Sequence, residues 1–271
     1  MSMKITYLGT AAAEGFPAVF CNCQYCNAAR RLGGKNIRTR SQALINDDLL
    51  LDFPADTYSH FLRNEVCADQ IKYLLITHPH QDHLYPGDLS IRGGAYAHDM
   101  LVQTMRIFGS EAVCNEIGKT PRNTEITVLK PFEAVEIGDY RVTPLPARHT
   151  PEGGALIYLI EGDKTLLYAH DTGYFYEEVF SYIEKNKIKL DMISLDCTNV
   201  DIPITDEGRH MGFPNIARVL ERLSAMGAVH ASTKKFVNHF SNNGNPLHHL
   251  LEQRAGEYGC SVSYDGCSVT L

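Results

Sequence analysis

The feature that most constrains this chain is a group of four metal-binding side chains directly after an apolar run. The run spans residues 71–76, and His78, His80, Asp82 and His83 follow within the next seven positions. A short apolar run is typical of a buried strand, and a strand end fixes the backbone from which a loop can turn several side chains into one cavity. Imidazole and carboxylate are ligands of divalent transition metals. The sequence therefore predicts a metal site at a strand exit.

The spacing within this motif favours two ions over one. His78 and His80 are two positions apart, so an extended backbone points both side chains the same way, whereas Asp82 and His83 lie around the next turn. One ion cannot easily use all four groups, and paired ions are a common arrangement in hydrolases. Since the chain has 12 histidines, a chance cluster in a solvated loop is the alternative. The adjoining strand favours the dinuclear site.

A second cluster contains three thiols within six positions, Cys21, Cys23 and Cys26. Its Cys-x-x-Cys spacing lets one loop hold a tetrahedral zinc ion, so we predict a structural Zn²⁺ whose fourth ligand comes from elsewhere. Unmetallated thiols and a vicinal redox pair are the alternatives. The chain has 8 cysteines, and without a secretory signal reduced thiols or a metal site are expected in place of disulfides.

Length and charge limit the class of protein. A chain of 271 residues with 44% hydrophobic content can bury a large core, and we expect one domain over residues 1–271. The formal charge of -7 argues against broad binding to nucleic acid. No signal-peptide pattern and no apolar run of membrane-spanning length occur, so we expect no membrane partner and a cytoplasmic location.

The predicted elements mix strands and helices in both halves, which indicates a layered α/β fold with ligands at strand exits. Strands are predicted at residues 4–8, 42–45, 49–52, 71–76, 105–108, 127–129, 134–137, 140–144, 155–160, 165–169 and 191–195, at a strand ending at Val237, and at two short strands around Asp265 and Gly266. Helices are predicted at residues 57–66, 111–117 with Ser110 as N-cap, 177–186, 215–226 closed by Gly227, and 246–257, with a short helix and turn at 87–94.

At this point the residues resemble a known family. Over essentially its whole length the chain is similar to the metallo-β-lactamase superfamily, and within it to the PhnP-like cyclic phosphodiesterases, with RNase Z and PqqB as relatives. The segments that carry the likeness are the opening Tyr7-Leu8-Gly9-Thr10, the three cysteines, the motif at 78–83, His149, His170-Asp171-Thr172-Gly173, Asp196-Cys197-Thr198, His210 and His239-Phe240-Ser241. The resemblance implies a four-layer αβ/βα fold, in which two mixed sheets are sandwiched between helices.

The resemblance also implies a ligand set for two divalent ions, Zn²⁺ or Mn²⁺, with Fe as a further option. One ion would be held by His78, His80 and His149, the other by Asp82, His83 and His239, and Asp171 would bridge them. Two metals about 3.5 to 4 Å apart can activate a shared water and stabilise charge on phosphoryl oxygens. The resemblance therefore gives Asp82 and Asp171 a catalytic role.

Four further residues have an implied role and a plainer alternative. His210 corresponds to the histidine that family phosphodiesterases place over the metals, where it binds a phosphate oxygen or protonates the leaving group, and otherwise it is a surface loop residue. His170 either orients Asp171 or belongs to the sheet. Arg148 and Arg209 flank the site histidines and either steer a phosphate or are solvated. A further expectation is that Thr10 and the glycine-alanine loop around it shape one wall of the pocket.

One position departs from the PhnP-like pattern. In that family a histidine three positions after the second-metal histidine completes the structural zinc site, and here this position is Asn242. Asparagine is a poor zinc ligand, so His248, His249 or water would complete the cysteine site, or the site is empty.

The function that follows is a phosphodiesterase acting on a small, cyclic phosphate ester. The alternatives are RNase Z-like processing of transfer RNA, a lactone or thioester hydrolase, and a PqqB-like protein without hydrolytic activity. RNase Z-like processing needs a long Gly- and Lys-rich arm, and no such insertion is found. A homodimer is implied by the resemblance alone.

Overall fold

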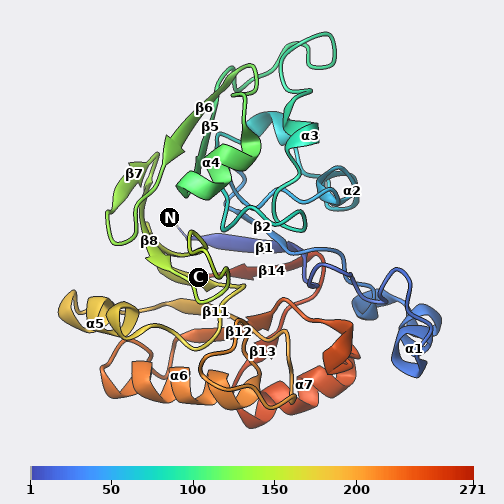
Figure 1. Cartoon of the computed structure of the whole chain (residues 1–271), viewed down its shortest axis with the longest axis vertical. Helices are drawn as coiled ribbons and strands as arrows, with labels where there is room; N and C mark the ends of the chain where they lie inside the picture. The colour runs from blue at the N-terminus through green and yellow to red at the C-terminus, as the bar shows by residue number, and fades with distance from the viewer. Residues whose placement is uncertain (1) are drawn as a thin grey trace.

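The chain folds into two mixed sheets of seven strands each. The computed structural model, which describes residues 2–271, is shown in Figure 1. The first sheet has the order β14 (Cys267–Thr270), β1 (Lys4–Gly9), β2 (Gln42–Ile45), β3 (Leu49–Leu51), β4 (Tyr73–Leu75), β5 (Met105–Gly109), β6 (Thr124–Val128). The second has the order β13 (Ser261–Val262), β12 (Lys234–Asn238), β11 (Met192–Asp196), β10 (Thr165–Ala169), β9 (Leu156–Glu161), β8 (Tyr140–Pro146), β7 (Val135–Ile137).

The inner faces of the two sheets pack against each other and form the central core. Ile5 and Leu51 from the first sheet belong to the same buried cluster as Ile160 and Leu166 from the second, and all four are at most 1% exposed. Burial of this kind contributes roughly 25 cal/mol for each Å² of apolar surface removed from water. The sheets are therefore held in one fixed relation, which matters because the ligands come from both.

Two polar contacts also join the sheets near the predicted site. The hydroxyl of Tyr158 in β9 donates to the carbonyl of Ile76, 2.5 Å away, and the amide of Leu156 donates to the carbonyl of Thr77 at 2.9 Å. Both acceptors directly precede His78. The backbone that leads into the histidine motif is therefore anchored by the opposite sheet.

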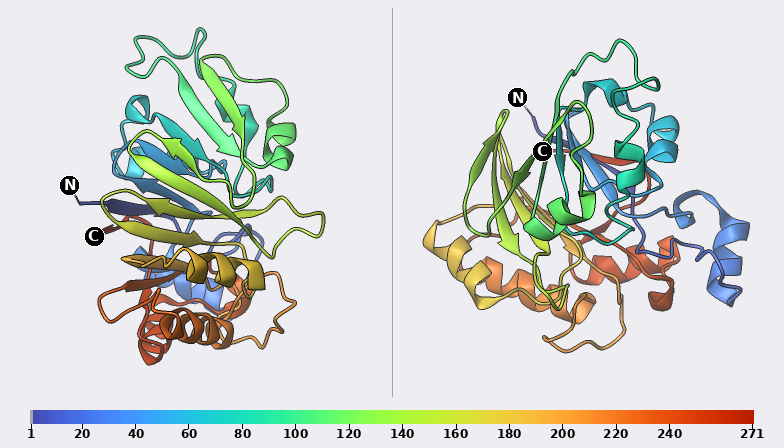
Figure 2. Two further views of the ribbon diagram at one scale, coloured as in Figure 1. Left: turned by 90° about the vertical axis from the view of Figure 1, so that its left-hand side faces the viewer. Right: turned by 45° about the horizontal axis from the view of Figure 1, so that its top comes forward.

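Helices cover the outer face of each sheet, as Figures 1 and 2 show. Those on the first sheet are α2 (Thr57–Arg63), α3 (Pro86–Leu89) and α4 (Glu111–Ile117), and those on the second are α5 (Glu177–Lys185), α6 (Phe213–Ala225) and α7 (His248–Glu257). Phe61, Leu89 and Val113 pack on the first sheet, while Val179 and Leu223 pack on the second. The four-layer αβ/βα fold is thus confirmed. None of the helices in the described residues is long and apolar enough to cross a membrane.

One prediction of strand grouping is wrong. The alternating segments at 127–129, 134–137 and 140–144 predict the extension of a single sheet, but β6 is the edge of the first sheet and β7 begins the second. The two final strands lie in different sheets, with β13 beside β12 and β14 beside β1. Sequence alternation identifies strands but contains no information about their neighbours, which packing decides.

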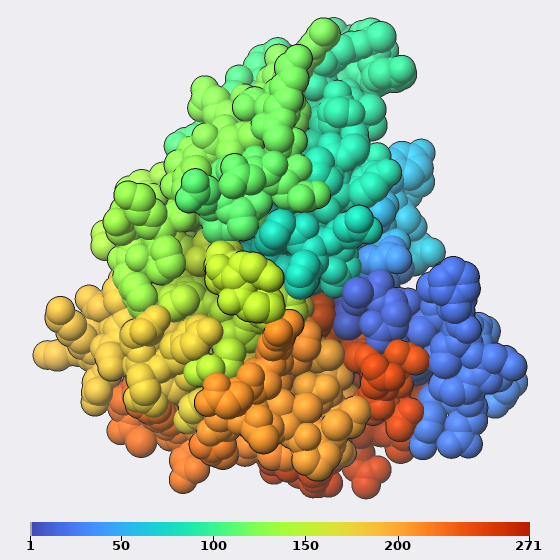
Figure 3. All heavy atoms as spheres, in the orientation of Figure 1, coloured from blue at the N-terminus to red at the C-terminus, as the bar shows by residue number. Residues whose placement is uncertain are grey.

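One helix was not predicted. The helix α1 (Gln24–Leu32) begins inside the cysteine segment, and Cys23 is its N-cap, with the sulfur accepting from the backbone amide of Cys26. The Cys-x-x-Cys spacing predicts a loop there, and cysteine is not among the usual N-cap residues. Figure 3 shows this N-terminal segment, in blue, projecting at the edge of the molecule.

We predict that Leu223→Ala lowers the free energy of unfolding by about 2–5 kcal/mol, because it leaves a cavity where α6 packs on the second sheet. Leu223 is 0% exposed. Chemical denaturation of the protein with its metals removed measures the change without a contribution from ligand binding. The neighbouring exposed residue provides the control, and Ser224→Ala should change the value by less than about 0.5 kcal/mol. Equal losses in both variants would contradict this packing.

Candidate metal centre

The first group of candidate ligands contains His78, His80 and His149. One ring nitrogen of each histidine faces the other two residues. His80 Nδ1 lies 2.9 Å from His78 Nε2 and 3.1 Å from His149 Nε2. His78 follows β4 in the first sheet, whereas His149 follows β8 in the second, so the packing of the sheets brings them together. His80 is the exposed member, and the other two are buried. The structure therefore unites the three residues predicted to hold one ion.

The second group contains Asp82, His83 and His239. His83 Nε2 lies 3.3 Å from His239 Nε2 and 3.4 Å from Asp82 Oδ2. His239 directly follows β12 and has a φ of 62°, in the left-handed region that side chains rarely adopt. This strained backbone turns its ring toward the motif from the first sheet, and the predicted ligands of the second ion are again adjacent.

Asp171 lies between the two groups, as predicted. Its Oδ2 is 2.8 Å from His83 Nε2 and 2.9 Å from His239 Nε2, and its Oδ1 is 3.6 Å from His149 Nε2. The side chain is 3% exposed, yet Oδ2 has no hydrogen-bond partner of acceptable geometry. A buried carboxylate oxygen without a hydrogen bond is costly unless a cation satisfies it. The two oxygens face different groups, which is the arrangement of a bridging ligand.

The tautomers of four histidines also match metal ligation. The Nδ1 atom of His83 lies 2.7 Å from a carboxylate oxygen of Asp52, that of His78 lies 3.0 Å from the Thr77 hydroxyl, and that of His239 lies 2.8 Å from the Thr198 hydroxyl. His149 Nδ1 donates more weakly to the carbonyl of Arg209, at 3.4 Å. A proton on each Nδ1 leaves the Nε2 lone pair facing the centre, where a divalent ion can accept it. The donor set therefore fits divalent metals.

The charges at the centre also favour a bound cation. Burial tends to raise the pKa of Asp171, but the charges of His239 and His83 outweigh it and hold the pKa well below its usual value. Burial opposes the charged form of His83, yet the carboxylates of Asp171, Asp52 and Asp82 raise its pKa well above the ordinary value. Since these carboxylates favour a cation in a buried site, a bound metal ion would replace the proton they otherwise retain.

The buried histidines of the first group have lowered pKa values, in contrast to His83. Burial lowers the pKa of His78 well below its usual value, with the charge of His83 acting in the same direction, and burial also lowers the pKa of His149. Both imidazoles are therefore neutral at physiological pH, the form in which histidine binds a metal.

Sequence reasoning missed Asp52, which supports the motif from behind. It follows β3, has a φ of 65° and is fully buried. Besides contacting His83, its carboxylate accepts from the amide and the hydroxyl of Thr77, at 2.8 and 2.9 Å. An aspartate at the exit of a predicted strand is the signal that could have identified it.

Asp196, one of the residues that carry the family resemblance, organises the other side of the centre. Its buried carboxylate accepts from the backbone amides of Asp171 and Met211, at 3.1 and 2.9 Å, and from the hydroxyl of Thr198 at 3.0 Å. It also lies 3.0 Å from His210 Nδ1. The side chain of Asp196 therefore connects the backbone of Asp171, the Thr198 hydroxyl that contacts His239, and the loop that bears His210.

His210 lies at the edge of the ligand groups, where it was predicted. Its ring is stacked on that of His239 at 5.7 Å between centroids, and its Nδ1 is 3.9 Å from Asp171 Oδ1. Burial lowers the pKa of His210, but the charge and hydrogen bond of Asp196 and the charge of Asp171 raise it to about 9. The imidazolium form therefore predominates at neutral pH.

The loop that bears His210 lies close to the Asp171 segment because residue 173 is glycine. A Cβ on Gly173 would lie 1.8 Å from the backbone carbonyl oxygen of Gly208, so any side chain at position 173 would push the loop away.

The remaining residues with a predicted role are not members of the ligand groups. His170 is fully buried, with Nε2 2.7 Å from the Ser194 hydroxyl, so it belongs to the sheet. Arg148 donates to the carbonyl of Tyr174 and to Glu207, while Arg209 is exposed. Thr10 is 0% exposed, with its hydroxyl bonded to Asp265 and Arg38, so its side chain is engaged within the fold.

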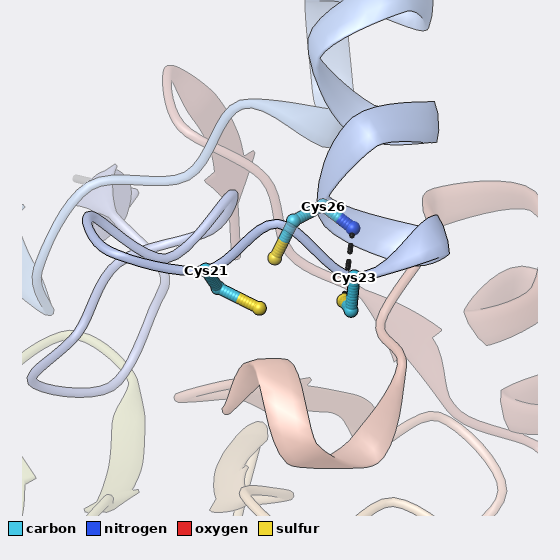
Figure 4. Close-up of side chains that lie close together, drawn as sticks. All are labelled: Cys21, Cys23 and Cys26. Carbon is cyan, nitrogen blue, oxygen red and sulfur yellow. Dashed lines mark hydrogen bonds between the residues drawn. The ribbon is translucent and has the colours of Figure 1, made fainter.

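The three cysteines form a separate cluster at the start of α1. Figure 4 shows Cys21, Cys23 and Cys26 with their sulfur atoms converging, and all three sulfurs lie within 4.8 Å of one another. The amide of Cys26 lowers the pKa of the Cys23 thiol to about 7, while burial raises the pKa of Cys26 to about 11. The cluster predicted from spacing is therefore assembled.

The fold and the ligand groups define the class of protein. The sequence model of the β-lactamase superfamily domain matches residues 52–239, most of the chain, and the chain belongs to this superfamily, whose members are mostly metal-dependent hydrolases. The match begins at Asp52 and ends at His239, so it includes both ligand groups.

The chain is also similar to individual proteins of known structure or role. The chain is 25% identical over 325 positions to coenzyme PQQ synthesis protein B of Acinetobacter baumannii strain ACICU, covering 99% of this chain and 100% of the relative. A diphosphatase from the PhnP family superposes with a TM-score of 0.77 at 18% identity, covering 100% of this chain and 98% of the other. Zn²⁺-bound PqqB from Methylobacterium extorquens superposes with a TM-score of 0.72 at 17% identity, covering 99% and 100%. These superpositions establish the shared fold.

We predict that Asp52→Asn weakens metal binding at the second group by about 10- to 100-fold, because His83 loses the carboxylate that orients its ring. Competition with a chromophoric chelator measures this change. Asp56→Asn is the matched control, since Asp56 follows the same strand but pairs with Arg40, 3.1 Å away. Unchanged affinity in Asp52→Asn would show that the contact with His83 does not support the ligand.

Proposed function

We propose that this protein is a dinuclear metal-dependent phosphodiesterase that cleaves a small, cyclic phosphate ester. The observation that carries the proposal is Asp171, a buried carboxylate whose two oxygens face two separate triads of ligands. Bound there, a pair of divalent ions, Zn²⁺ or Mn²⁺ with Fe as a further option, would supply an activated water and charge stabilisation for phosphoryl oxygens.

The residues of the centre would form two metal-binding sites joined by one bridging ligand. In this proposal His78, His80 and His149 hold one ion, Asp82, His83 and His239 hold the other, and Asp171 contacts both. Asp82 is less deeply buried than Asp171, and the charge of His83 is the main factor that lowers its pKa despite partial burial. A carboxylate that remains ionised next to the centre can bind metal and orient water at any physiological pH.

His210 is the proposed acid of the reaction. Its Nδ1 donates to Asp196, so the ring orientation is set and Nε2 is left for substrate. A protonated imidazole can donate to a phosphate oxygen or to the departing alkoxide, and the return of a proton from water restores it. In this pair the carboxylate of Asp196 orients the imidazole of His210, as a buried aspartate orients the histidine of a catalytic triad.

Charge favours a small substrate over RNA. The formal charge of -7 opposes non-specific attraction to a polyanion, and binding of nucleic acid depends on clustered Lys and Arg. Near the centre, Arg148 is committed to Tyr174 and Glu207. We therefore favour a small-molecule phosphate ester as the partner, with neither nucleic acid nor membrane involved, and we retain the homodimer as an expectation of the resemblance.

A second candidate is a role like that of coenzyme PQQ synthesis protein B. The whole-chain likeness to that protein favours it. Metal bound at the His/Asp groups without turnover of any phosphodiester would favour this candidate over the phosphodiesterase.

We predict that His80→Ala lowers turnover of bis(p-nitrophenyl) phosphate by at least about 100-fold and releases metal, while leaving the circular dichroism spectrum unchanged. The fold should persist because His80 is exposed, whereas its Nδ1 is the meeting point of the first triad. Activity is compared after removal of metals and reconstitution with Zn²⁺ or Mn²⁺. His249→Ala, an exposed histidine on α7, should behave as wild type. Wild-type turnover in His80→Ala would contradict the proposed centre.

We also predict that His210→Gln lowers kcat by about 100- to 10,000-fold for an alkyl phosphodiester and much less for a p-nitrophenyl ester. A good leaving group departs without protonation, so the difference between the two substrates reports proton donation. Glutamine keeps a polar side chain of similar reach and therefore controls for lost contacts. Equal losses for both substrates would assign His210 to binding instead of acid catalysis.

A further inference from the structure

Hydrogen bonds from the backbone hold two of the three sulfur atoms of the cysteine cluster. The backbone amide of Ala18 donates to Cys26 Sγ, and that of Cys26 donates to Cys23 Sγ, each at 3.4 Å. The guanidinium of Arg30 donates to the carbonyls of Ala18 and Cys21, at 3.3 and 2.9 Å, which ties the preceding loop to α1. These contacts fix three sulfurs near one point and stabilise negative charge on two of them.

The sulfur spacing suits a thiophilic ion. A tetrahedral zinc ion with Zn–S bonds of about 2.3 Å places its sulfurs about 3.8 Å apart, and the three sulfurs here lie within 4.8 Å of one another. A small contraction of the loop would close the difference. Cys26 is buried, while Cys21 and Cys23 are partly exposed, so one side of the cluster faces solvent.

No fourth ligand joins this cluster within residues 2–271. Among His, Asp and Glu side chains in that range, none contributes an atom within 4.8 Å of all three sulfurs. His248 is turned away, with Nδ1 2.9 Å from Arg38 and Nε2 3.0 Å from Glu252. His249 is exposed, and the backbone N–H of Asn242 donates to the carboxylate of Glu14. Of the alternatives for the fourth ligand, neither His248 nor His249 lies at the cluster, which leaves water or an empty position.

We propose that the cluster binds zinc through three thiolates only and leaves the fourth coordination position open to an exogenous ligand, such as water or an imidazole. An open position makes the ion exchangeable and reachable by small ligands, unlike a closed structural site. The proposal is independent of the phosphodiesterase, because the cluster shares no residue with the His/Asp centre.

Cobalt substitution of the full-length protein tests the proposal. Co²⁺ bound to thiolates gives a near-ultraviolet charge-transfer band that histidine and carboxylate ligands do not give, so the cysteine site is observed separately from the other centre. We expect this band in wild type and its loss in Cys23→Ser. Cys21→Ser serves as a second variant if Cys23→Ser does not fold, and Cys67→Ser, an exposed cysteine outside the cluster, should retain the band. Absence of the band in wild type would overturn the proposal.

The fourth position is tested with added imidazole and with Asn242→His. Imidazole should shift the visible cobalt bands of wild type, measured as the difference from Cys23→Ser, and should leave those of Asn242→His unchanged. After addition of EDTA, the charge-transfer band should decay faster in wild type than in Asn242→His by about tenfold or more. His248→Gln and His249→Ala should leave the wild-type spectrum unchanged. A wild-type spectrum insensitive to imidazole, or altered by either histidine variant, would show a closed site and overturn the proposal.

Discussion

The buried carboxylate of Asp171 is the interaction on which the rest of the centre depends. It lies where the two sheets meet, within 3 Å of nitrogens from His83 in the first sheet and His239 in the second. Three negative side chains gather around His83, and a buried set of this kind is stable only with compensating positive charge. Protons can supply that charge in part, and divalent ions can supply it fully. Because the two histidines come from different sheets, the geometry of the ligands depends on how the sheets pack.

The supporting residues show how the fold holds such a charged group in place. Asp52 and Asp196 are both fully buried, and each accepts hydrogen bonds from backbone amides as well as from side chains next to the ligands. Each carboxylate is thus fixed by the chain before it orients a histidine. This arrangement limits the motion of the ligands and makes the centre a property of the folded sheets.

The two proposed metal sites differ in origin. The cysteine cluster comes from one continuous segment stiffened by α1, so it needs little of the tertiary fold to bring its sulfurs together. The His/Asp centre takes ligands from the ends of β4, β8, β10 and β12, which belong to both sheets. Unfolding would therefore separate the motif at 78–83 from His149, Asp171 and His239, whereas all three thiols would remain neighbours along the chain.

The sequence by itself indicated the motif at 78–83 and the cysteine cluster, because strand exits and ligand spacing are local signals. Its family resemblance supplied the fold class, the seven proposed ligands of the His/Asp centre and the place of His210. Tertiary structure decided what local signals cannot contain. Sheet packing placed β6 and β7 in different sheets and β13 and β14 apart, and it brought Asp52 behind His83 and Asp196 beside His210. It also directed His248 toward Arg38 and away from the sulfurs. Each of these outcomes depends on contacts between residues distant in sequence, which are specified by burial of the whole core.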